Sequence, residues 1–66
     1  MTYELVNQLT TNSLASFETE REAVAIYREF AESDPDFAAD LLIVRFDEEG
    51  EAVEAHPAAE RSAVLA

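Results

Sequence analysis

Hydrophobic and polar residues alternate in the first part of the chain. The segment Tyr3 to Leu9 roughly alternates, a cluster of turn-forming residues follows at positions 10–13, and a second short segment runs from Leu14 to Phe17. This pattern predicts two short strands joined as a hairpin. Because no Asn-Gly pair is present, the type of turn and the register of the two strands stay open.

The spacing of hydrophobic residues changes at Thr19. The sequence Thr19-Glu20-Arg21-Glu22 has the form of a capping box, in which a threonine and a glutamate satisfy the first free amides of a helix. Hydrophobic residues then recur at helical spacing, at Ala23, Ile26, Tyr27 and Phe30. Pro35 disfavours helical geometry at Asp34, so we predict an amphipathic helix over roughly 20–33.

The second half of the chain predicts another hairpin. Positions 34–40 read as a connecting loop in which Phe37 turns inward, and positions 41–46 form a β-branched and aromatic strand. Gly50, the single glycine, supplies a turn before a fourth strand at about 51–55. Pro57 then precedes a short run of helix formers at 58–65.

These elements predict an α+β fold in one domain, residues 1–66. We expect a four-stranded, mainly antiparallel sheet with one helix packed on one face, in the order ββαββ, followed by a short C-terminal helix. The helix is expected to pack on sheet residues such as Leu5, Phe17, Leu42, Val44 and Phe46. Alternation then places Val6, Leu41 and Ile43 on the opposite, uncovered face, mixed with Glu4 and Arg45.

A hydrophobic face that no other element covers usually marks a binding interface. Val6, Leu41 and Ile43 are therefore the candidate interface residues.

Composition limits the partners that such a face can have. Fifteen acids, four arginines and no lysine give the 66 residues a net charge of −11. This charge repels nucleic acids and anionic lipids, so we expect a neutral or basic protein partner, or a second copy of the chain. Many alanines, and arginine in place of lysine, suit either a GC-rich genome or a high-salt cytoplasm, and composition does not separate the two.

The chain has no cysteine, which excludes disulfides, thiolate zinc sites and thiol catalysis. Its longest hydrophobic stretch, Leu41 to Val44, is far too short to cross a bilayer. With no basic segment and hydrophobic run at the N-terminus, we expect a cytoplasmic protein.

No motif in the chain points to catalysis. His56 stands between alanine and proline, and the serines lack the glycine-rich elbow of hydrolase nucleophiles. The acids at 34, 36 and 40, and those at 47, 48, 49 and 51, do not follow the calcium-loop pattern and are expected to be solvated. We therefore predict no catalytic, metal-binding or cofactor-binding residues and no enzymatic activity.

Four segments resemble a group of short, uncharacterised acidic prokaryotic proteins with a ββαββ pattern. They are Tyr3 to Leu5, Ser16 to Glu20, Ala23 to Arg28, and Leu42 to Asp47 with the Asp-Glu-Glu-Gly sequence that closes it. The resemblance implies the small α+β fold and assigns no functional residues.

Two functions remain as hypotheses. The first is a non-enzymatic interaction module that forms a homodimer or larger homo-oligomer through the open sheet face, because a core of this size gives little stability alone. The alternative is a DNA mimic, whose carboxylates imitate phosphates and inhibit a basic nucleic-acid-binding protein.

Overall fold

The four predicted strands form a single antiparallel sheet. The computed structural model describes residues 1–65, with strands β1 (Thr2–Asn7), β2 (Asn12–Phe17), β3 (Leu41–Phe46) and β4 (Ala52–Pro57). Their order in the sheet is β2-β1-β3-β4, and every neighbouring pair is antiparallel. The two hairpins therefore join through β1 and β3 at the centre, a strand order that the sequence pattern leaves open, and the predicted α+β fold is confirmed.

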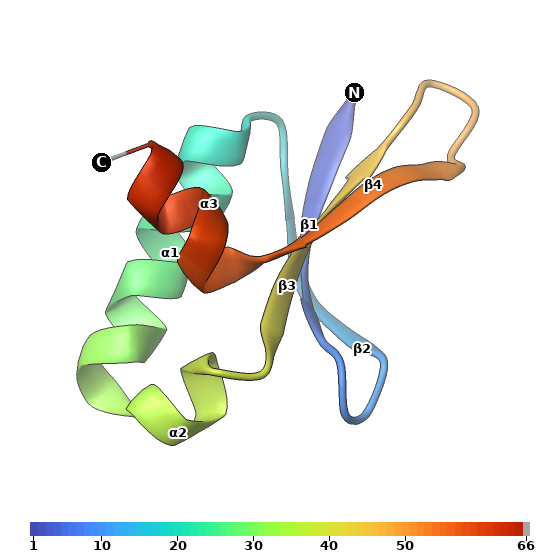
Figure 1. Ribbon diagram of the computed structural model, residues 1–66. Coiled ribbons are helices and arrows are strands. Elements are labelled where there is room, and N and C mark those ends of the chain that lie inside the picture. The colour runs from blue at the N-terminus through green and yellow to red at the C-terminus, as the bar shows by residue number, and fades with distance from the viewer. Residues whose placement is uncertain (66) are drawn as a thin grey trace.

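Three helices lie on one side of this sheet (Figure 1). They are α1 (Glu20–Ser33), α2 (Pro35–Ala38) and α3 (Ala58–Val64). The start of α1 has the threonine half of the predicted capping box, because the Thr19 hydroxyl accepts a hydrogen bond from the Glu22 amide at 3.2 Å, while the Glu22 carboxylate accepts from the Thr19 hydroxyl at 3.0 Å. The opposite side of the sheet carries no helix in residues 1–65 (Figure 1).

The predicted loop at 34–40 instead contains the short helix α2. Asp34 ends α1, where its amide donates to the Phe30 carbonyl at 2.7 Å. The same residue starts α2, because its carboxylate accepts from the Phe37 amide at 3.2 Å. Pro35 occupies the first turn of α2, where a missing amide costs nothing. As predicted, Phe37 points inward, and its ring centroid lies 5.5 Å from that of Phe30.

The core lies between the helices and the sheet. It is small, and three of its seven fully buried hydrophobic residues are alanines. Larger side chains pack around it while remaining partly exposed, among them Tyr3, Phe17, Ile26, Tyr27 and Phe30. The buried hydrophobic residues are Leu5, Ala23, Val24, Ala38, Leu41, Ile43 and Ala58.

The expected orientation of β3 is wrong. Leu41 and Ile43, which we expected on the open face, are only 1% and 2% exposed and belong to the core. Ile43 pairs with Leu5 across the sheet, and directly paired residues share a face. Leu42, Val44 and Phe46, which we expected in the core, therefore lie on the open face.

The error has a physical cause in the composition of β3. Positions 41–44 are hydrophobic on both faces, so alternation gives no indication of which face is buried. Because Arg45 is charged, we expected its side of β3 to face water, but Arg45 lies on the same side of the sheet as Ile43. It lies near the end of β3, where it pairs with Glu54 and remains partly exposed.

Two arginine contacts join α3 to α1. Arg61 binds the Glu20 carboxylate through two hydrogen bonds of 3.0 and 2.7 Å. Arg28 donates to the Ser62 hydroxyl and to the Ser62 carbonyl, both at 2.9 Å. Because α3 has only seven residues and no side-chain N-cap, it depends on these contacts and on the fully buried Ala58.

The turn between β3 and β4 requires a residue in the left-handed region. Gly50 has φ of 85°, and its amide donates to the Asp47 carbonyl at 3.1 Å. A β-carbon at Gly50 would meet no atom within 4 Å, so a substitution there acts through the backbone alone. Asp47 also accepts from the Glu49 and Glu51 amides at 2.9 and 3.0 Å, which fixes the turn around the glycine.

We predict that Gly50→Ala lowers the free energy of unfolding by about 1 kcal/mol, because an L-residue is strained at this φ. Urea denaturation followed by circular dichroism measures the change. A variant as stable as the parent would mean that the turn relaxes to another conformation.

Thr11, in the β1–β2 turn, has φ of 59°, which is unusual for a β-branched residue. Asparagine tolerates this conformation better. We therefore predict that Thr11→Asn raises the free energy of unfolding by roughly 0.5–1 kcal/mol. The opposite signs expected at Thr11 and Gly50 can be compared in a single series of urea melts, and a loss of stability in Thr11→Asn would contradict the prediction.

Candidate functional site

The open face of the sheet is the main candidate site. We define it by strand pairing and alternation from the central pairs Thr2↔Phe46, Glu4↔Val44 and Val6↔Leu42. Most of its side chains are hydrophobic, and no element of residues 1–65 covers them. Its members are Thr2, Glu4 and Val6 of β1; Ser13, Leu14 and Ser16 of β2; Leu42, Val44 and Phe46 of β3; and Ala52, Val53, Ala55 and Pro57 of β4.

Only one of the three predicted interface residues lies on this face. Val6 is there, half-buried between its neighbours on β2 and β3. Leu41 and Ile43 are in the core and are unavailable to a partner. Sequence reasoning missed Leu42, Val44 and Phe46, and the pairing of β1 with β3 is the observation that identifies them.

Both edge strands carry a bulge that adds a hydrophobic residue to the open face. The register of β2 shifts opposite Leu5 and Val6, which leaves Leu14 as the extra residue. The register of β4 shifts opposite Arg45 and Phe46, which leaves Val53 as the extra residue. Leu14 and Val53 are 39% and 46% exposed. Bulges distort the edges for pairing with another strand, so contact through the face is favoured over contact through an edge.

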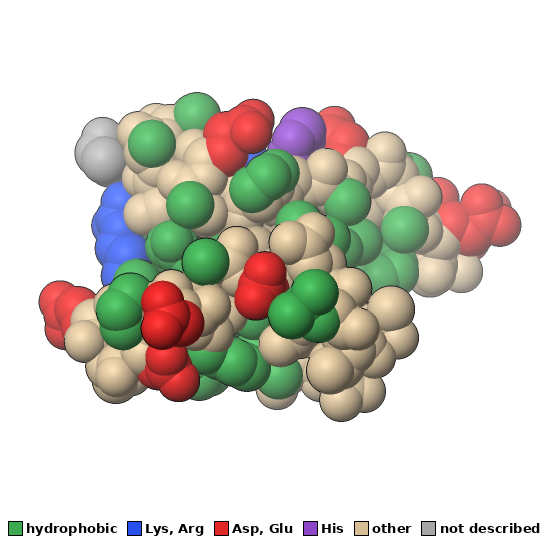
Figure 2. Space-filling model, turned by 60° about the horizontal axis from the view of Figure 1, so that its bottom comes forward, with side chains coloured by type: hydrophobic (Ala, Val, Ile, Leu, Met, Phe, Trp, Pro, Cys, Tyr) green, Lys and Arg blue, Asp and Glu red, His purple; other side chains and the backbone are tan. Residues whose placement is uncertain are grey.

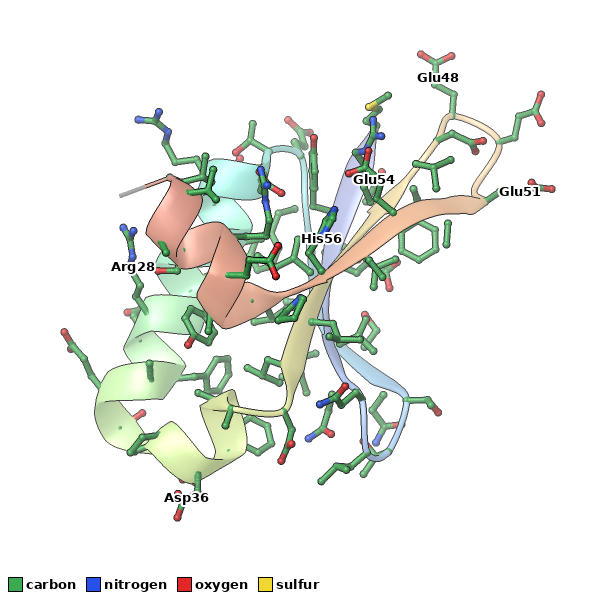
Figure 3. The ribbon with its side chains drawn as sticks, in the orientation of Figure 1. Arg28, Asp36, Glu48, Glu51, Glu54 and His56 are labelled. Carbon is green, nitrogen blue, oxygen red and sulfur yellow. The ribbon has the colours of Figure 1, made fainter. Side chains whose placement is uncertain are left out.

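Acidic residues avoid the open face. Glu4 is the only acid among its thirteen members, although the chain has fifteen acids. Figure 3 shows other acids at opposite ends of the molecule, with Asp36 at the tip of α2 and Glu48 and Glu51 at the β3–β4 turn. On the side of the molecule drawn in Figure 2, hydrophobic side chains separate the acidic groups. The open face is therefore a nearly neutral surface on a strongly acidic protein.

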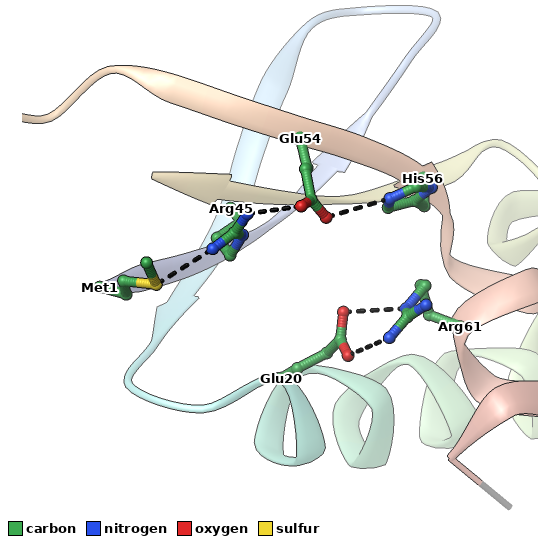
Figure 4. A network of polar contacts seen from close by, with 6 residues as sticks. All are labelled: Met1, Glu20, Arg45, Glu54, His56 and Arg61. Carbon is green, nitrogen blue, oxygen red and sulfur yellow. Dashed lines mark hydrogen bonds and ion pairs between the residues drawn. The ribbon is translucent and has the colours of Figure 1, made fainter. Parts of the chain in front are cut away.

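A second cluster lies on the helix side of the sheet, beyond the core. The Glu54 carboxylate binds two groups at once: Arg45 Nη2 at 2.5 Å and His56 Nε2 at 3.2 Å (Figure 4). Arg45 also donates to the Met1 sulfur at 3.2 Å. The hydrogen bond with His56 first, and then the hydrogen bond and the positive charge of Arg45, hold the pKa of Glu54 below its usual value.

This cluster links β3 to β4. The Glu54 side chain is 49% exposed and that of His56 is 38% exposed. General acid or base chemistry needs a carboxyl group whose ionisation is shifted by burial, and it needs a pocket for substrate. A hollow lined by Met1, Asp47, Glu48 and Glu49 is shallow and open.

The two acidic clusters of the sequence have local roles. Asp34 caps α2, and Asp47 organises the turn around Gly50. Within residues 1–65, no three Asp, Glu or His side chains converge in a way that could hold a metal ion. Over the same residues, no helix has both the length and the hydrophobicity needed to cross a membrane.

Comparisons of the chain with family models, with characterised proteins and with solved structures find no match. Function must therefore be argued from the surfaces described above.

The pKa of Glu54 gives a test of the polar cluster. Because the carboxyl pKa is lowered in the folded state, Glu54 stabilises the folded protein at pH values above 4.5, the ordinary pKa of this group. This stabilisation is lost as the pH falls through the lowered pKa. We predict that Glu54→Gln melts at a lower temperature than Glu48→Gln at pH 7, and that the difference shrinks as the pH falls below 4.5. Glu48→Gln removes the same charge from the exposed turn, so equal melting temperatures at pH 7 would show that the cluster contributes nothing.

Proposed function

We propose that the protein is a non-enzymatic interaction module that forms a homodimer through its open sheet face. The observation that carries the proposal is the hydrophobic row Leu42, Val44 and Phe46 of central strand β3, which residues 1–65 leave uncovered. Hydrophobic surface of this kind is favourably removed from water.

Charge favours a second copy as the occupant. A basic partner would be attracted to the acid-rich helices, turns and loops, where thirteen of the fifteen acids lie. The open face offers such a partner only Glu4. Two copies that each carry −11 repel one another least where their charge is lowest, and the open face is that surface. A nearly neutral hydrophobic face is best matched by another of the same kind.

The area of the face sets the strength of association. Four strands about 4.8 Å apart, each rising about 3.3 Å per residue over six residues, give a face of roughly 20 by 20 Å. Two such faces packed about 10 Å apart would bury about 800 Å² in total. Because stable complexes usually bury about 1,200–2,000 Å², we expect a weak dimer, with a Kd in the micromolar range or above.

We predict that Val44→Glu weakens the dimer at least tenfold, because each copy would place a second carboxylate near the centre of the interface. Sedimentation equilibrium in 0.5 M NaCl measures the Kd. Val64→Glu is the matched control, since Val64 is a 61% exposed residue of α3 and lies away from the sheet.

Val53→Glu provides a second variant at a site that is already exposed, in case Val44→Glu does not fold. A parent protein that stays monomeric at millimolar concentration would overturn the proposal. If the parent protein captures a basic DNA-binding protein, and Val44→Glu captures it equally well, that result would favour DNA mimicry instead.

A further inference from the structure

Glu4 occupies the centre of the proposed interface. It is the third of six residues in central strand β1, and its partners are Val44 on β3 and Ser16 on β2. The side chain is half-buried, although no other structural element covers this face. The single acid of the open face is thus located at its middle and not at its rim, where an interface normally keeps its charges.

Within strands β1, β2 and β3, no other charged side chain is paired with Glu4 or flanks it on the open face, and the nearest other acid in this register is Glu18, which directly follows β2. On its own strand the flanking residues of the same face are Thr2 and Val6, and its cross-strand partners are Ser16 and Val44. Arg45 and Glu54 extend to the other side of the sheet, and β4 is not adjacent to β1. Nothing in this surface compensates the negative charge of Glu4.

A symmetric dimer brings two such carboxylates together. In a two-fold interface each surface meets its own copy, and an axis that passes through the centre of the open face places the two Glu4 side chains opposite one another. Two carboxylates that approach one another between hydrophobic surfaces cannot both stay ionised, because each loses water and repels the other. With one proton, the protonated carboxyl can donate a short, strong hydrogen bond to the remaining carboxylate.

We infer that dimerisation through the open face takes up one proton, shared by the two Glu4 side chains, and therefore strengthens as the pH falls. This inference rests on the proposed function, because it concerns the same face. It adds a regulatory property, since the oligomeric state would respond to pH between about 5 and 7, above the range in which ordinary carboxylates are protonated.

The experiment measures Kd by sedimentation equilibrium at pH 7, 6 and 5 in 0.5 M NaCl, for the parent and for Glu4→Gln. Uptake of one proton per dimer predicts that the parent Kd falls about tenfold per pH unit. Glu4→Gln, which keeps the shape of the side chain and removes its charge, is expected to dimerise at pH 7 as tightly as the parent does at pH 5, with no pH dependence.

His56→Gln is the control for the single histidine of the chain. His56 pairs with Ile43 and lies on the helix side of the sheet, so this variant is expected to keep the pH dependence of the parent. Circular dichroism at each pH establishes that the variants remain folded.

Failure of the inference and failure of the proposed function are distinguishable. If the parent and Glu4→Gln dimerise with the same pH dependence, or if His56→Gln alone removes it, Glu4 is not the coupled group while the dimer stands. If both proteins are monomeric at every pH, the open face does not self-associate and both conclusions fall.

Discussion

The pairing of β1 with β3 determines the rest of the structure. Leu5 lies opposite Ile43, and Asn7 lies opposite Leu41, so these side chains share the face that the helices cover. A shift of one residue in this register would exchange the two faces of β3 and expose Ile43 to water. Because β2 pairs with β1 and β4 with β3, both hairpins take their orientation from this central contact. The same pairing that builds the core also presents Val44 on the opposite side.

The core that results is too small to explain the fold by hydrophobic burial alone. Alanines supply much of it, which lets helices approach the sheet closely but removes little surface from water per residue. Polar contacts between distant segments complement it. Arg28 and Arg61 hold α3 against α1, and Arg45 joins β3 to β4. Three of the four arginines thus connect elements within the chain, which leaves little positive charge to offset the acids at the surface.

The sequence was sufficient wherever a local physical rule decides the structure. The capping threonine placed the start of α1, Pro35 placed its end, and Gly50 marked the second turn. It was insufficient where a long-range contact decides. The four hydrophobic residues at 41–44 fit a strand in either orientation, and only their pairing with β1 selects one. Helix α2 was missed because the proline that ends α1 also begins another turn of helix, and neither arginine contact to α3 has a local signal.

The sheet has an open face although Leu41 and Ile43 are buried on its other side. Covering one face of a four-stranded sheet takes all three helices that residues 1–65 form, so the second face has no layer whichever way β3 is turned. If β3 were reversed, different hydrophobic residues would be uncovered, but some hydrophobic residues would be uncovered in either orientation. Glu4 behaves differently, because β1 is oriented by the burial of Leu5 and Asn7. Its carboxylate is directed away from the helices in either case, so an isolated charge at the centre of a hydrophobic surface is a consequence of the fold itself. Such a charge keeps the surface hydrated in the monomer, and the same charge must be neutralised before that surface can be buried.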